Sequence, residues 1–394
     1  MKENRFQPFE FKSAKADRGD KKMKKVLLAL FLSIAVIFNF GVVNAAQSTD
    51  TVKEDKTARI FINGVQFKNS SVLILKNGTP MLAAEYFTAL GINTKNQVWD
   101  KAKKKLTLTK GSTKLVLELD SSNYTLNGKK ATIKVKPFTY KGKPYFPIEQ
   151  AAVSFGSKFV SDADTNTYFI KANSDFTKNK QLLGKILTIM NSASKLKVNE
   201  DVKLSLNGTG FKYSLSGLAS SLIDKKGKLS LSNVDYDIST NGIPAKSNVQ
   251  MYFADNFLNV KVNGGEWAAQ ALTKEQADEQ FDLKNNLGYD DLICSALTVA
   301  NGTTKDEQIL KGNVIMGISI PTLMSGQGLV KNKINTKSVE VTFNKNTNVV
   351  SKIVLKETGT TEVNLATYNF SVSYTITYSD INGKFEVEMP DGLK

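Results

Sequence analysis

Histidine and cysteine decide which catalytic chemistry this sequence excludes. The 394 residues contain no histidine and a single cysteine, Cys294. Without an imidazole there is no Ser-His-Asp or Cys-His catalysis and no histidine metal site. One cysteine allows neither an intrachain disulfide nor a cysteine-rich zinc site. Cys294 lies in the apolar segment Asp-Leu-Ile-Cys-Ser-Ala-Leu, so we expect a buried thiol rather than a nucleophile.

Paired carboxylates are the acid and base of glycoside hydrolysis, and the sequence contains two adjacent pairs. These are Asp278 with Glu279 and Asp290 with Asp291. Adjacent residues on a helix do not face each other, and no sequence feature connects the pairs with a sugar cleft. We therefore interpret them as solvated helix faces, and a carboxylate hydrolase stays the weakest alternative.

Two further patterns resemble sites without completing them. Asp162-Ala-Asp-Thr-Asn opens like a calcium loop, but Thr167 replaces the required glycine and Asn173 the required glutamate. Ser192-Ala-Ser-Lys195 has the S-x-x-K spacing of acyl transferases without their S-D-N or K-T-G partners. We therefore expect no cofactor, no metal and no enzymatic activity.

Residues 23–45 have the features of a secretory signal peptide. Lysines precede the apolar run Val26–Phe38, and Val-Asn-Ala then allows cleavage between Ala45 and Ala46. An uncleaved anchor is the alternative, since Val26–Val43 approaches a membrane-spanning length. We expect cleavage, and hence a secreted protein on the cell surface with no stable membrane span. Residues 1–22 are polar, which indicates a disordered tail or a wrongly assigned start before Met23.

After a polar linker, 46–57, one pattern occurs twice between residues 58 and 172. Phe-Ile-Asn-Gly at 61–64 returns 64 positions later as Thr-Leu-Asn-Gly, and Asn-Gly-Thr-Pro-Met-Leu at 77–82 returns as Lys-Gly-Lys-Pro-Tyr-Phe. Asn-Gly favours tight hairpins, and each unit predicts a strand, turn, strand, helix and strand.

These motifs resemble the stalk domain of secreted Gram-positive proteins, also called the copper amine oxidase N-terminal-like domain. Gly-Lys-Pro-Tyr-Phe-Pro-Ile at 142–148 and Val-Trp-Asp at 98–100 are similar to its hallmark segments, whereas Ala83, Glu85 and Glu149 depart from its proline and arginine positions. Amine oxidation needs histidine ligands for copper, which this chain lacks. The resemblance therefore implies an extracellular spacer module.

Residues 176–394 predict one helix at about 176–194, then many alternating strands and a mostly helical insertion at 273–300. Strand patterns continue to 314–320 and 385–389. The predicted fold class is thus α+β: a duplicated strand-turn-strand-helix-strand stalk domain, then a curved antiparallel sheet, or half-barrel, with helices.

The second domain resembles the LolA/LppX-like lipoprotein-carrier half-barrel. The similar segments are Tyr-Phe at 252–253 through Val262, Gly-Gly-Glu-Trp at 264–267, and 378–390. The resemblance implies an apolar groove for a lipid or other apolar ligand, for which Tyr252, Phe257 and Trp267 are the candidates. Ordinary core positions for these aromatic residues are the alternative.

Charge indicates the kind of partner. Residues 46–394 contain 44 basic and 33 acidic side chains, a net charge of +11. No basic run is interleaved with aromatics, so nucleic acid is not expected. The leading prediction is a non-catalytic cell-envelope protein whose stalk carries a domain for an apolar ligand. The alternative is a structural module without a cavity, which adheres to anionic cell-wall polymer.

Overall fold

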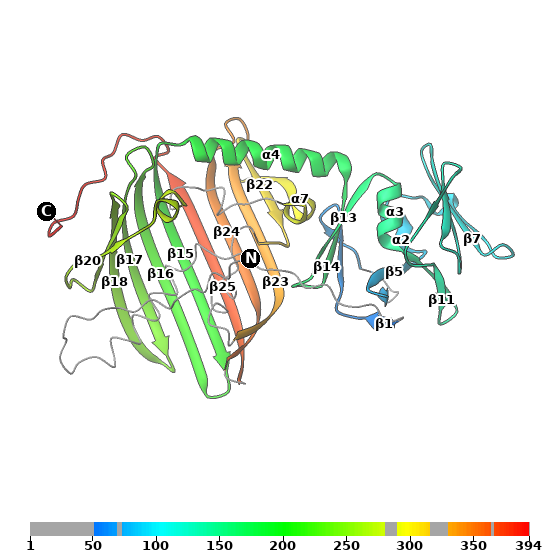
Figure 1. Ribbon diagram of the computed structural model, residues 1–394, viewed down its shortest axis with the longest axis horizontal. Helices are drawn as coiled ribbons and strands as arrows, with labels where there is room; N and C mark the ends of the chain where they lie inside the picture. The colour runs from blue at the N-terminus through cyan, green and yellow to red at the C-terminus, as the bar shows by residue number, and fades with distance from the viewer. Residues whose placement is uncertain (1–50, 69–72, 280–289, 316–329, 364–365, 394) are drawn as a thin grey trace, which may run out of the picture.

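The protein is mostly β, and its strands form three small sheets followed by one large curled sheet (Figure 1). The computed structural model describes residues 51–68, 73–279, 290–315, 330–363 and 366–393. The predicted α+β class overestimates the helices, because the segment 273–300 is helical only in part. α5 (Lys274–Glu279) and α7 (Asp291–Ala296) are short, and Thr298–Asn301 is strand β21.

Three sheets form the N-terminal module, residues 51–172. The first has the order β1-β4-β5-β12-β11, the second β10-β9-β8-β7-β6 and the third β13-β14-β2-β3. Their strands are β1 (Val52–Asp55), β2 (Arg59–Ile62), β3 (Val65–Gln66), β4 (Leu73–Lys76), β5 (Thr79–Ala83), β6 (Gln97–Asp100), β7 (Lys105–Lys110), β8 (Thr113–Glu118), β9 (Asn123–Leu126), β10 (Lys129–Thr132), β11 (Phe138–Tyr140), β12 (Lys143–Pro147), β13 (Ser157–Asp162) and β14 (Thr167–Ala172).

Short helices and tight turns connect these strands. The helices are α2 (Tyr86–Ala89), the 3-10 helix η2 (Thr94–Asn96) and α3 (Ile148–Ser154). The predicted Asn-Gly turns are confirmed, since Asn63 and Asn127 have φ values of 49° and 52° and the glycines after them are also positive. Strand β1 lies inside the predicted linker 46–57, because its backbone pairs with β4.

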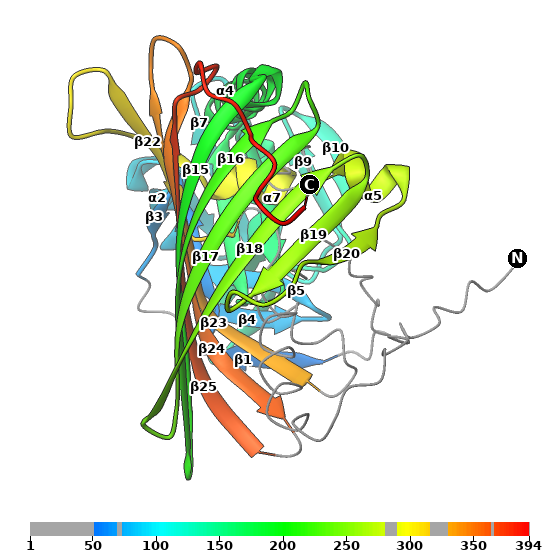
Figure 2. The same cartoon turned by 90° about the vertical axis from the view of Figure 1, so that its left-hand side faces the viewer.

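The large sheet has eleven antiparallel strands in the order β20-β19-β18-β17-β16-β15-β25-β24-β23-β22-β21. They are β15 (Lys195–Gly208), β16 (Phe211–Asp224), β17 (Leu229–Thr240), β18 (Ile243–Ala254), β19 (Phe257–Val262), β20 (Ala268–Ala271), β21, β22 (Glu307–Gly312), β23 (Val330–Asn344), β24 (Val350–Val363) and β25 (Ala366–Ser379). Figure 2 shows the sheet curling as a half-barrel.

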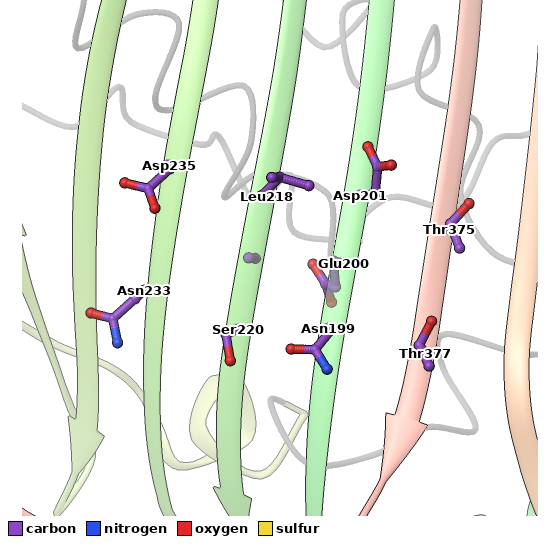
Figure 3. A pocket seen from close by; sticks show the side chains of 10 residues that line it. Asn199, Glu200, Asp201, Leu218, Ser220, Asn233, Asp235, Thr375 and Thr377 are labelled. Atoms are coloured by element: carbon purple, nitrogen blue, oxygen red, sulfur yellow. The ribbon is translucent and has the colours of Figure 1, made fainter.

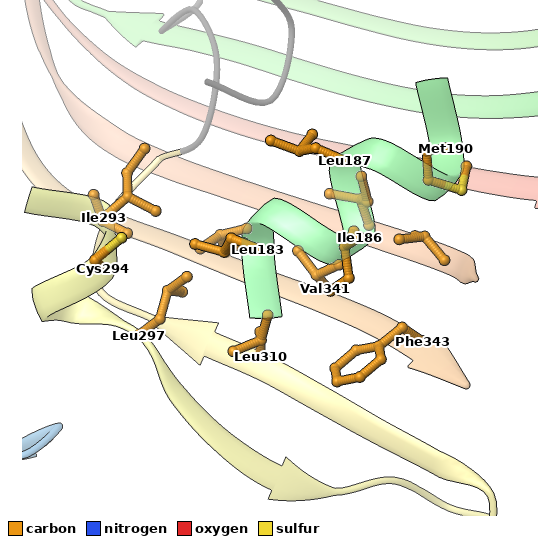
Figure 4. Close-up of a cluster of buried hydrophobic side chains, with 14 of the residues drawn as sticks. Leu183, Ile186, Leu187, Met190, Ile293, Cys294, Leu297, Leu310, Val341 and Phe343 are labelled. Atoms are coloured by element: carbon orange, nitrogen blue, oxygen red, sulfur yellow. The ribbon is translucent and has the colours of Figure 1, made fainter. Parts of the chain in front are cut away.

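Helix α4 (Asn173–Ser192) follows β14 directly and crosses one end of the large sheet (Figure 1). Its apolar side chains pack with α7 and with strands β15, β22, β23, β24 and β25. Figure 4 shows Leu183, Ile186 and Leu187 of α4 above Val341 and Phe343 of β23. We call the sheet face beneath α4 the inner face and the opposite face the outer face.

The N-terminal module contacts the large sheet through buried apolar side chains and through a buried ion pair. Phe61 and Phe169 belong to the same apolar cluster as α4. The Lys337 ammonium of β23 lies 2.7 Å from an Asp164 carboxylate oxygen and 3.6 Å from one of Asp162. The two parts are therefore packed against each other and do not merely share a linker.

Two other predicted elements differ from the structure. Residues 385–389 form no strand, because the segment after β25 crosses the outer face instead of pairing with an edge. The predicted strand at 314–320 lies largely outside the described residues, and Val314 itself is not in a strand. The predicted cap of the insertion is confirmed: Thr273 and Gln276 exchange hydrogen bonds at 2.9 and 3.2 Å.

Candidate functional site: the inner face of the curled sheet

Burial along β15 shows where the inner face is covered and where it opens. Leu196 and Val198, beneath α4, are 1% and 5% exposed. Farther along the same face of the strand, Val202, Leu204 and Leu206 are only half-buried. Side chains two residues apart share a face, so this gradient reflects the end of helix cover and not a change of face. Along β15, the inner face beyond α4 is thus incompletely covered.

This part of the inner face is lined by apolar side chains from seven neighbouring strands. We call it the inner apolar band: Leu204, Leu206, Leu215, Tyr236, Ile238, Val249, Met251, Val260, Val262, Ile334, Phe370 and Val372. The strand registers place all of them on one face. Such a band gains free energy, about 25 cal/mol per Å², when an apolar ligand removes it from water.

Glycines in the band allow aromatic rings to lie close to the backbone. A Cβ at Gly217 would lie 2.9 Å from Tyr236 Cε1 and equally close to Val202 Cγ1. At Gly359 it would lie 2.7 Å from two ring carbons of Phe370. A Cβ at Gly359 would also clash with the Lys333 carbonyl oxygen, so both positions require glycine for this close packing.

A polar cluster separates the helix-covered end of the inner face from the inner apolar band. Burial raises the pKa of the Glu200 carboxyl, and a hydrogen bond from the Tyr374 hydroxyl opposes that shift. Burial, with the nearby Glu200 charge, also raises the phenol pKa values of Tyr374 and Tyr378. Proton transfer at these phenols near neutral pH is therefore disfavoured, and the cluster is suited to accept or donate hydrogen bonds.

The three predicted groove residues lie on the other side of the sheet. Tyr252 is 4% exposed on the outer face, where Trp267, Phe385 and Val387 pack around it. Phe257 begins β19, pairs with Ala254 and is 47% exposed. Successive side chains of a strand point to opposite faces, so in β18 Met251 points to the inner face and its neighbour Tyr252 to the outer face. Tyr252 and Trp267 thus share an outer-face core instead of a ligand groove.

The strand alternation in the sequence already contained the residues of the inner apolar band. The sequence prediction missed them because it chose aromatic residues as the groove. Nothing in the sequence indicated which face of the sheet the helices would cover. The signal that could have found them is which alternating positions of each strand lie on the same face as the residues that pack against α4.

The outer face has a shallow polar hollow of about 360 Å³ (Figure 3). Two rows of cross-strand neighbours line it. The first row is Thr375, Asp201 and Leu218, and the second is Thr377, Asn199 and Ser220. Apart from Leu218 and Ala219 its lining is polar or charged.

The carboxylates considered for chemistry have structural partners. Asp290 accepts a hydrogen bond of 2.8 Å from the Ile293 amide and caps α7, while Asp291 forms a 2.8 Å ion pair with Lys158. Asp162 and Asp164 contact Lys337. The side chains of Asp278 and Glu279 lie outside the described residues. Within the described ranges, no group of three His, Cys, Asp or Glu residues is arranged to hold a metal ion.

Part of the chain is similar to a known protein family. Residues 61–170 match the family described as the copper amine oxidase N-terminal domain. The comparison with curated proteins found no match. None of the helices in the described part combines the length and hydropathy that a membrane-spanning helix requires.

Several solved structures align with about half of the chain. LprF from Mycobacterium bovis aligns with a TM-score of 0.32 and 10% identity, over 55% of this chain and 97% of its own. A DUF1329 family protein from Desulfovibrio piger aligns with a TM-score of 0.23 and 12% identity, over 54% and 95%. At these TM-scores we base no functional argument on either alignment.

Proposed function

We propose that this protein is a secreted, non-catalytic cell-envelope protein whose large sheet binds an apolar, lipid-like ligand. The observation that carries the proposal is the inner apolar band beyond α4, in which Leu204, Leu206, Leu215 and Met251 are only half-buried while Val249 and Phe370 are buried. The Glu200 and Tyr374 pair at its edge would hold the polar end of an amphipathic ligand by hydrogen bonds.

The N-terminal module would then serve as a duplicated spacer. The pairing of β5 with β12 supports duplication, since Leu82 pairs with Phe146, its counterpart at the 64-residue offset. Met81 pairs with Pro147 and Ala83 with Tyr145, as expected around a local two-fold axis. The family match at 61–170 is consistent with this role.

Mass spectrometry of the protein secreted through its own signal tests both parts of the proposal. The denatured mass should correspond to a chain that begins at Ala46. The native spectrum should contain additional non-covalent mass that organic solvent releases. An unsecreted chain would contradict the envelope location, and an uncleaved chain would contradict release from its signal. Variants test the ligand proposal separately.

Leu215 and Leu218 of β16 provide a matched pair for that second test. Leu215 is half-buried on the inner face, and Leu218 is 60% exposed on the outer face. Leu215→Asn should weaken binding of a fluorescent long-chain fatty acid at least tenfold, because it places an amide in the band. Leu218→Asn should leave binding unchanged. Equal affinities of the two variants, both folded by circular dichroism, would refute the inner-face site.

A further inference from the structure

The positive charge of the chain is concentrated in the N-terminal module. Residues 51–172 contain 20 basic and 9 acidic side chains, whereas residues 173–394 contain 24 and 23. The large sheet and its helices are thus almost neutral, and the module alone has a net charge of +11. A polyanion would be attracted to one part of the molecule and not to its whole surface.

Within the module, one end of the β6–β10 sheet gathers exposed lysines. We call it the lysine end: Lys95, Lys114, Lys129 and Lys130, where the β7–β8 and β9–β10 turns lie. The two turns are joined by Lys114, whose amide donates to Asn127 Oδ1 at 2.7 Å and whose carbonyl accepts from the Asn127 amide at 2.8 Å.

Lys95 belongs to the same end because β6 and β7 run side by side. Gln97 at the start of β6 pairs with Leu108 near the end of β7. A fifth lysine, Lys110, fixes this corner by donating from Nζ to the Leu90 carbonyl at 2.7 Å. The residues of the two turns are otherwise small and polar.

The opposite end of the same sheet differs, because its lysines have acidic partners. Ion pairs there join Lys103 to Asp100 at 3.5 Å, Lys104 to Asp120 at 3.8 Å and Lys105 to Glu118 at 3.3 Å. Among the residues that the structure describes, the four side chains of the lysine end form no ion pair. Their charges are free for an external anion.

We propose that the lysine end docks on a linear anionic polymer with repeating phosphates. The turns present glycine, serine, threonine and asparagine beside the lysines and no large apolar side chain that would insert into a bilayer. A flexible polyphosphate or phosphodiester chain therefore suits this surface better than a membrane does. The proposal locates the predicted polymer adhesion at the lysine end. It does not depend on whether the inner face binds an apolar ligand.

Two charge-matched variants of the full mature chain test the proposal. The first is Lys95→Gln, Lys114→Gln, Lys129→Gln and Lys130→Gln. The control is Lys101→Gln, Lys103→Gln, Lys104→Gln and Lys136→Gln, four exposed positions on strand-connecting segments of the same module. Both variants have the same net charge, and circular dichroism verifies that both are folded.

Binding to immobilised inorganic polyphosphate is the readout. Four phosphate contacts, each releasing about 0.7 counterion, predict roughly 50-fold weaker wild-type binding at 200 mM than at 50 mM salt. The first variant should lose at least tenfold in affinity and the control less than threefold. Equal losses would assign the attraction to diffuse net charge and overturn the proposal, as would no loss at all. Stronger binding to phosphatidylglycerol vesicles than to polyphosphate would overturn it in favour of a membrane.

Discussion

At the scale of single residues, burial decides what the titratable groups do. Cys294 is fully buried, and burial raises the pKa of its thiol to about 11. A thiolate is therefore scarce at neutral pH, in agreement with the structural role expected from the sequence. Asn179, 4% exposed in α4, donates to the Cys294 carbonyl at 2.9 Å and the Leu297 carbonyl at 2.7 Å. This side chain fixes α7 to α4.

Glu200 makes the unfolding free energy depend on pH. Its pKa is raised in the folded state, so the fold binds a proton more tightly than the unfolded chain does. Stability should fall as pH rises from the unfolded pKa through the raised folded pKa, and then remain level. Glu200→Gln removes the charge, so at pH 7 the variant should be more stable than wild type by on the order of 1 kcal/mol.

Urea unfolding at several pH values measures this difference. It should shrink toward zero at pH 3, where the wild-type carboxyl is protonated in both states. Glu340→Gln, at an exposed outer-face position of β23, is the control. A stability gain that is the same at pH 3 and pH 7 would refute an electrostatic origin.

At the scale of elements, the segment after β25 shows how an irregular stretch takes part in a core. Phe385, Val387 and Leu393 pack on Tyr252 and its outer-face neighbours. Hydrogen bonds hold the segment in place: Lys195 Nζ donates to the Phe385 carbonyl at 2.6 Å, and Trp267 Nε1 donates to the Asp391 carbonyl at 3.2 Å. The segment thus replaces a covering helix on this face.

Truncation of one buried side chain tests that role. Val387 is 8% exposed, whereas Met389, two residues later, is 45% exposed. Val387→Ala should lower the unfolding free energy by about 1.5 kcal/mol, at about 0.8 kcal/mol for each buried carbon. Met389→Ala should change it by less than about 0.5 kcal/mol. Equal effects in urea unfolding would mean that the segment does not form part of the core.

At the scale of the whole molecule, the two parts are joined by a nearly buried charge. Lys337 and Asp162 are 8% and 4% exposed, and Asp164 completes the contact. The β2–β3 turn also touches β21 so closely that a Cβ at Gly64 would clash with Thr298. These contacts pack the N-terminal module against the large sheet.

Removing the ammonium should therefore destabilise the joined molecule. Lys337→Met removes the ammonium beside the buried Asp162 carboxylate, whose remaining positive neighbour is Arg59, and should cost about 3 kcal/mol. Lys333→Met, at an exposed position of the same strand, should cost little. Differential scanning calorimetry measures both. Asp162→Asn combined with Lys337→Met should recover part of the loss, and no recovery would show that the cost is not electrostatic.

The sequence alone determined the local features, because these depend on few neighbours. Asn-Gly pairs required the left-handed backbone of tight turns, apolar spacing placed a helix at 176–194 that the structure has at 173–192, and Thr273 with Gln276 specified a cap. The absence of histidine limited the chemistry. Alternating strands also predicted a curved antiparallel sheet.

Only the tertiary structure decided which face of each strand became the candidate site. Alternation assigns Met251 and Tyr252 to opposite faces, but either face satisfies the pattern until α4 packs against one of them. That choice placed Tyr252 and Trp267 under the C-terminal segment and left Leu215 and Met251 half-buried. It also brought Lys337 to Asp162 across a separation of 175 residues, which no local pattern encodes.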